Sequence, residues 1–109
     1  MSNNIQHPVA RNVREQELLA SLVYHPFKAQ VSQSSLTNIS DLITYNYKEL
    51  APEILLERVT LVLGSDGETA KAHSAEEIAA IAFGMVQRAN ETDAFAPTKD
   101  EILAKQFIH

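Results

Sequence analysis

Histidine is the side chain best suited to metal binding or proton transfer near neutral pH, and this chain has four: His7, His25, His73 and His109. None of them belongs to an HExxH pattern, and the chain has no cysteine that could add a thiolate ligand. A zinc site built from one helix or one loop needs such a pattern. The sequence therefore predicts no metal site and no cofactor, and we expect His73 to have a structural or solvent-facing role.

Acidic and glycine-rich segments are the next candidates for chemistry. The segment 64–71, GSDGETAK, has the glycines and lysine of a phosphate-binding loop but not the GxxxxGK(S/T) spacing. Its two acids do not alternate over twelve residues, as the ligands of a calcium loop do. No serine stands in a GxSxG setting. We therefore predict a protein that is not an enzyme.

A helix-turn-helix motif is one alternative function. The segment 74–85, SAEEIAAIAFGM, has the pattern of a first helix with Gly84 at the turn. A recognition helix must reach phosphates and base edges, yet the segment 86–95 holds one base, Arg88, and two acids. The formal net charge of −5 also argues against broad affinity for nucleic acid. DNA binding stays an alternative, and we do not expect nucleic acid as the partner.

A second alternative comes from the segment 24–28, YHPFK. It resembles a YHPxK segment of small helical-hairpin domains in phage proteins that sequester cyclic-nucleotide signals. The resemblance covers about five of the 109 residues. It implies that Tyr24 stacks on a base and that Lys28 meets a phosphate. The interpretation that we prefer makes Tyr24 an aromatic at the core edge and Pro26 the stop of a helix.

Composition limits the class of protein. A chain of 109 residues forms one domain, here 1–109 with a loose segment at 1–8. Apolar residues make up 45%, which is typical of a globular protein, and no run approaches the ~18 residues of a membrane span. There is no signal-peptide pattern, and the absence of cysteine fits the cytoplasm. We expect a cytoplasmic protein with no membrane partner.

The strongest helix signal is the segment 74–90, SAEEIAAIAFGMVQRAN. Ser74 and Glu77 have the spacing of a capping box, in which each side chain satisfies the other residue's backbone N–H. Apolar residues then recur with the 3.6-residue period of one helix face. They are Ile78, Ile81, Ala82, Met85 and Ala89. We therefore predict a helix here.

The rest of the chain indicates three more main helices and a short one, which makes an all-α, compact bundle. Apolar stripes predict a helix over about 9–23 and another over 36–50 that Ser34 or Ser35 caps. The alternation at 43–47 leaves a strand open there, and a buried strand at 59–63 is also open. We prefer helices because the wider spacing holds over longer segments.

Turn-forming residues mark the limits of the third helix and of the segments after it. Pro52 suits a first helical position, and Gly64 suits a left-handed residue just after the end of the same helix. The segment 64–73 has the composition of a linker between the third and fourth helices. Thr98 and Glu101 repeat the capping-box spacing and predict a short C-terminal helix.

Two sets of residues are candidates for a partner-binding face. Ala80 and Gly84 place small side chains four apart on one helix, which allows close approach of another helix from this chain or from a partner. Ile102, Leu103 and Phe107 lie on one side of the C-terminal helix, where they either bind a neighbour or cover the chain's own core. We expect a small protein–protein interaction domain, an adaptor, inhibitor or assembly subunit, whose partner is another protein or a second copy in a homo-oligomer.

Overall fold

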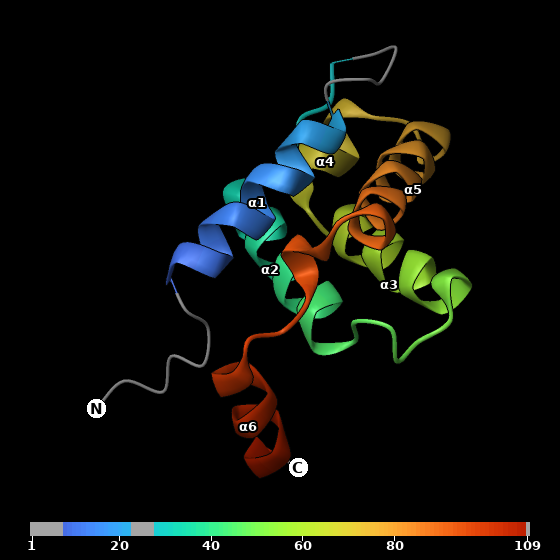
Figure 1. Cartoon of the computed structure of the whole chain (residues 1–109). Coiled ribbons are helices and arrows are strands. Elements are labelled where there is room, and N and C mark those ends of the chain that lie inside the picture. The colour runs from blue at the N-terminus through green and yellow to red at the C-terminus, as the bar shows by residue number, and fades with distance from the viewer. Residues whose placement is uncertain (1–7, 23–27, 109) are drawn as a thin grey trace.

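The computed structural model describes residues 8–22 and 28–108, and within them every regular element is a helix (Figure 1). The long helices are α1 (Pro8–Leu22), α2 (Gln33–Tyr45), α3 (Pro52–Gly64) and α5 (Ala75–Glu91). The short elements are α4 (Gly67–Ala72), the 3₁₀ turn η1 (Asp93–Phe95) and α6 (Lys99–Ile108). The prediction of four main helices and a short C-terminal one is confirmed. Neither segment left open as a strand, 43–47 or 59–63, forms one.

Helix α5 is the central element, and it packs against both α1 and α3. Its capping box forms as predicted: Ser74 Oγ accepts from the Glu77 N–H, and Glu77 Oε1 accepts from the Ser74 N–H (3.2 and 3.0 Å). The apolar stripe of α5 meets matching stripes of the other helices in one continuous core. The core residues are Leu18, Leu36, Ile39, Ile43, Leu55, Val59, Leu63, Ile78, Ile81, Ala82, Met85, Val86, Ala89 and Phe95.

Helix α2 is displaced from its predicted range at both ends. Its N-cap is Ser32, whose Oγ accepts from the Ser35 N–H (3.1 Å), so the predicted caps Ser34 and Ser35 lie inside the helix. At the other end Asn46 donates its side-chain amide back to the Leu42 carbonyl (2.7 Å), and Lys48 takes a left-handed backbone with φ of 59°. A left-handed residue stops an α-helix, so the helix ends before the predicted position 50.

The prediction of a linker at 64–73 was wrong, because most of this segment forms helix α4. Asp66 caps α4 by accepting from the Glu68 N–H, and the buried Thr69 hydroxyl donates to Asp66 Oδ2 (2.7 Å). Gly64 is the last residue of α3 and has no positive φ, so it is not the predicted left-handed residue. A six-residue helix is too short to show a hydrophobic period, which is why the pattern missed it.

Candidate interaction surface around Phe83

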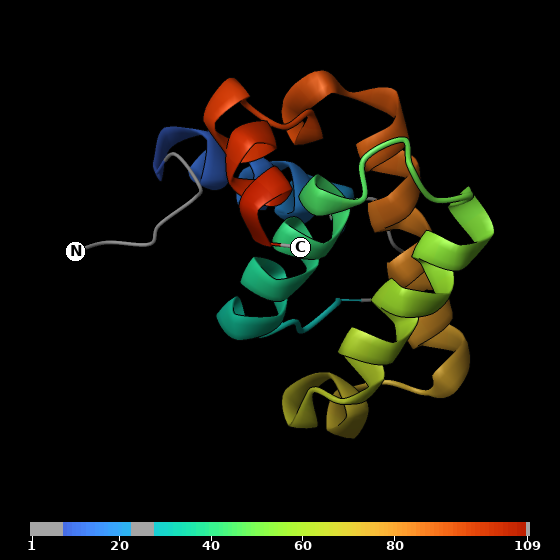
Figure 2. The same ribbon diagram turned by 90° about the horizontal axis from the view of Figure 1, so that it is seen from below.

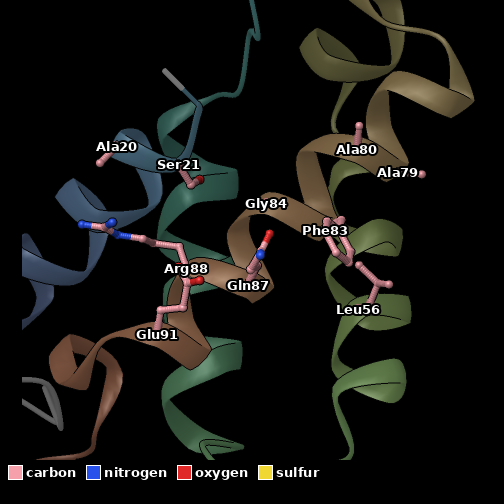
Figure 3. A pocket seen from close by; sticks show the side chains of 10 residues that line it. All are labelled: Ala20, Ser21, Leu56, Ala79, Ala80, Phe83, Gly84, Gln87, Arg88 and Glu91. Atoms are coloured by element: carbon pink, nitrogen blue, oxygen red, sulfur yellow. The ribbon is translucent and has the colours of Figure 1, made fainter. Parts of the chain in front are cut away.

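A hollow of about 660 Å³ opens between α1, α3 and α5 (Figure 3). We call it the α5 groove and define it by its lining: Ala20, Ser21, Leu56, Ala79, Ala80, Phe83, Gly84, Gln87, Arg88 and Glu91. Seven of these residues come from α5, on the side of that helix away from its buried stripe. The groove is therefore a property of the outer face of the central helix.

Small residues give the α5 groove its depth. Ala79, Ala80 and Gly84 place no long side chain over the middle of α5, so the helix backbone itself forms part of the floor. Gly84 lies inside an unbroken helix, where glycine costs about 1 kcal/mol relative to alanine. Gly84 is consequently not the turn that the helix-turn-helix interpretation placed there.

Phe83 is the dominant apolar side chain of this surface. It is 56% exposed, and it points toward Leu56 of α3 (Figure 3). A second hollow of about 300 Å³ lies against the same ring and also includes Pro52 and Val86. Phe83 thus lies between two apolar hollows, and a partner that covers both would remove the exposed part of an aromatic side chain from water.

Charged groups occupy the rim of the α5 groove. Arg88 donates to Glu17 of α1 through Nε and also lies close through Nη2, at 2.7 and 2.6 Å from Glu17 Oε1. This pair joins α1 to α5 along one side of the groove. The exposed carboxylates of Glu91 and Glu53 lie at the rims of the larger and the smaller hollow respectively. An apolar floor inside a polar rim is the usual anatomy of a binding interface.

A second cluster fixes helix α6 to the rest of the molecule. The fully buried Arg14 guanidinium donates to both carboxylate oxygens of Glu101, at 2.6 and 2.7 Å. It also donates to the carbonyls of Ala94 (3.1 Å) and Ala96 (2.9 Å). Glu101 Oε1 in turn accepts from the Thr98 N–H (2.7 Å), so the predicted capping box and the ion pair share one carboxylate.

The electrostatics of this cluster are those of a satisfied ion pair. Burial acts to raise the pKa of the Glu101 carboxyl, but the hydrogen bonds from Arg14 and Thr98 and the Arg14 charge hold that pKa below its ordinary value. Burial, together with the charges of Glu101 and Asp41, raises the pKa of the nearby Tyr45 phenol. Because the Arg14 donors are matched to acceptors, we interpret the cluster as structural.

The predicted site residues fall in different places. Ala80 and Gly84 lie together in the α5 groove, as one partner-face prediction requires. Ile102 and Leu103 are each 47% exposed on α6, so about half of each residue is open to a neighbour. Binding of a neighbour and covering of the chain's own core both stay predictions for these two residues. The backbone of Phe107 belongs to α6, but its side chain lies outside the described residues.

The cyclic-nucleotide alternative involves two residues that the structure treats differently. Tyr24 lies outside the described residues, and Lys28 is exposed in the coil before α2. An exposed lysine in coil is compatible with phosphate binding but does not by itself form a site. This alternative therefore stays a prediction from the sequence.

Phe83, Leu56 and the α1 residues of the groove were missed by sequence reasoning. The available signal was that Phe83 lies outside the buried stripe of α5, where a large aromatic residue has no core to enter. The contributions of Leu56 and Ala20 depend on how α3 and α1 pack on α5, which no local pattern records.

Other candidates for chemistry have structural roles. His73 Nε2 accepts from the Gln30 N–H (2.9 Å) and its Nδ1 lies 3.3 Å from Glu77 Oε1, which places the ring proton on Nδ1. Of the two roles expected for His73, structural or solvent-facing, its geometry fits the structural one, because its side chain is 4% exposed and joins the coil before α2 to α5. Among residues 8–22 and 28–108, no three acidic or histidine side chains gather as a metal site would require. In the same part of the chain, no helix has the length and apolar character to cross a bilayer.

A comparison with protein-family models gave no match, and comparisons with curated proteins and with solved structures gave none either. A function for this chain therefore has to come from its own surfaces.

Proposed function

We propose that this chain is a small, non-enzymatic protein–protein interaction domain, an adaptor, inhibitor or assembly subunit, and that the α5 groove is its contact face. The observation that carries the proposal is Phe83, a largely exposed aromatic ring between two apolar hollows. Aromatic side chains that become buried at an interface supply much of its binding energy. The cysteine-free composition supports a further proposal, that the protein works in the cytoplasm.

The shape of the groove favours an amphipathic helix as the occupant. Ala80 and Gly84 let a second helix backbone come close to α5, and a helix presents anchors at i, i+3, i+4 and i+7 to such a groove. The rim adds a charge preference, because Arg88 is paired with Glu17 whereas the Glu91 and Glu53 carboxylates face the solvent. We therefore infer a helix with an apolar face and at least one basic residue beside it.

The test compares three forms of the tagged protein as baits: wild type, Phe83→Glu and Leu61→Glu. Leu61 is the matched control, since it is 65% exposed on α3 and lines neither hollow beside Phe83. Each bait is co-expressed with an untagged copy of the chain, and its complexes are captured from the native cell lysate. The untagged copy allows a second copy of the chain to be captured as well.

We expect at least one protein, or the untagged copy, to be retained by wild type and Leu61→Glu and lost with Phe83→Glu. The amount of that protein retained by Phe83→Glu should be at least about tenfold lower than with wild type, because a buried charge replaces an aromatic anchor. Retention of the same set of proteins by all three baits would contradict the proposal.

A further inference from the structure

The chain exposes a second apolar surface, on α6. Lys99, Ile102 and Leu103 stand at i, i+3 and i+4, which puts them on one side of that helix. We call these three residues the α6 outer face. Figure 1 places α6 below the bundle of α1, α2, α3 and α5, and in the view from below in Figure 2 it lies in front of α1 and α2. Ile102 and Leu103 consequently meet solvent although both are large and apolar.

The buried ion pair determines which side of α6 faces outward. Consecutive residues of an α-helix differ by about 100° in direction. Glu101 is held inward by Arg14 and by its capping bond to Thr98, so the next two residues, Ile102 and Leu103, are turned away from Arg14. The exposure of the α6 outer face therefore results from a specific, bidentate contact and not from a loose end of the chain.

We propose that the occupant of the α5 groove is the α6 outer face of a second copy of this chain. This inference rests on the proposed function and names its partner. Ile102 and Leu103 supply the apolar anchors that the hollows beside Phe83 can bury. Lys99, in the first turn of α6, supplies the basic residue that the Glu91 or the Glu53 carboxylate favours. The exposed acid of the same turn, Asp100, lies about 100° further round the helix, beside the α6 outer face and not within it.

The geometry makes this contact heterologous. The described lining of the α5 groove comes from α1, α3 and α5, and it includes none of the α6 residues 99–104. Each copy thus offers one groove and one α6 outer face at different places on its surface. Copies joined in this way form a closed ring or reciprocal dimer where the rotation allows it, and an open chain otherwise.

Disulfide cross-linking tests the contact at residue level, since the natural chain has no cysteine. Ala80→Cys places a thiol in the groove, Leu103→Cys places one on the α6 outer face, and Leu61→Cys is the control on α3. The variants are mixed in pairs, with a size tag on one partner, and treated with a mild oxidant. Circular dichroism confirms that each variant is folded before mixing.

We expect Ala80→Cys with Leu103→Cys to give the cross-linked pair at least about fivefold more than Ala80→Cys with Leu61→Cys. A disulfide requires Cα atoms within about 7 Å, so this yield reports the proposed contact. Equal yields from both mixtures would overturn the inference. So would efficient cross-linking of Leu103→Cys with itself, which indicates α6 against α6. Capture of a different protein through Phe83, without the cross-link, would leave the proposed function standing and remove only this inference.

Discussion

The bundle and helix α6 are held in place by different forces. In the bundle, side chains such as Ile81 and Met85 are fully buried among apolar neighbours from several helices. Helix α6 instead depends on the bidentate contact between Arg14 and Glu101. Apolar burial is spread over many contacts and has no direction, whereas a buried ion pair fixes one orientation and is costly to break. The stability of the bundle should therefore tolerate small changes that the position of α6 does not.

The largest effect should come from breaking the ion pair on one side. Arg14→Met leaves the Glu101 carboxylate buried without its partner, and we expect a loss of about 3–5 kcal/mol in the free energy of unfolding. The double variant Arg14→Met/Glu101→Leu removes both charges and should recover most of that loss. Urea unfolding measures both variants, and a double variant as unstable as the single one would show that the charge is not the cause.

A core substitution sharpens the contrast. Ile81→Ala removes buried methyl and methylene groups from the centre of α5 and should cost about 2–5 kcal/mol. Hydrogen exchange separates the two mechanisms. Ile81→Ala should lower the protection of α3 and α5 amides together, whereas Arg14→Met should first lower that of α6. The same exchange pattern in the two variants would mean that α6 and the bundle unfold as one unit.

Acid provides a graded way to weaken α6. The pKa of Glu101 is lowered in the folded state by the Arg14 and Thr98 contacts, which outweigh burial. Its contribution to stability is therefore fully present above the ordinary value of 4.5 and is lost as the pH falls through the lower folded value. Unfolding by urea from about pH 7 to about pH 3 should show a steeper loss for wild type than for Glu101→Gln. Parallel curves would contradict this role.

The two capping boxes allow the smallest and most closely matched comparison. Ser74→Ala removes an N-cap of α5 and should cost about 1 kcal/mol of global stability. Thr98→Ala removes the corresponding hydroxyl of α6, so its effect should be greatest on the protection of α6 amides and smaller than that of Ser74→Ala on global stability. Global unfolding and residue-level hydrogen exchange together check both statements. An equal fall in global stability for Ser74→Ala and Thr98→Ala would contradict this difference.

Local signals were enough to predict most of the fold. The stripe of α5 and the pairs Ser74–Glu77 and Thr98–Glu101 act within a few residues, so the sequence displays them directly. Helix α4 is too short to show a period, and η1 carries one buried aromatic residue, Phe95, in a polar segment. These short elements were therefore missed.

The candidate site was harder to predict because it depends on distant residues. Ala80 and Gly84 were found from their spacing. Phe83 becomes part of a groove only because α3 packs on α5 and places Leu56 beside it. The orientation of α6 depends on Arg14, which is 87 residues away from Glu101 in the chain. An arginine inside a predicted helix gives no local sign that it will be buried, because its partner comes from another element.

Sedimentation velocity on mixed variants tests the central claim most directly, namely that the α5 groove receives the α6 outer face of another copy. Phe83→Glu should prevent binding at the α5 groove and leave the α6 outer face intact. Leu103→Glu should prevent binding through the α6 outer face and leave the α5 groove intact. Each variant alone should sediment as a single chain, and wild type and Leu61→Glu as larger assemblies. An equimolar mixture of Phe83→Glu and Leu103→Glu should form a one-to-one pair, because one intact groove and one intact α6 remain. A mixture that stays as single chains, or a wild type that never associates, would contradict the account.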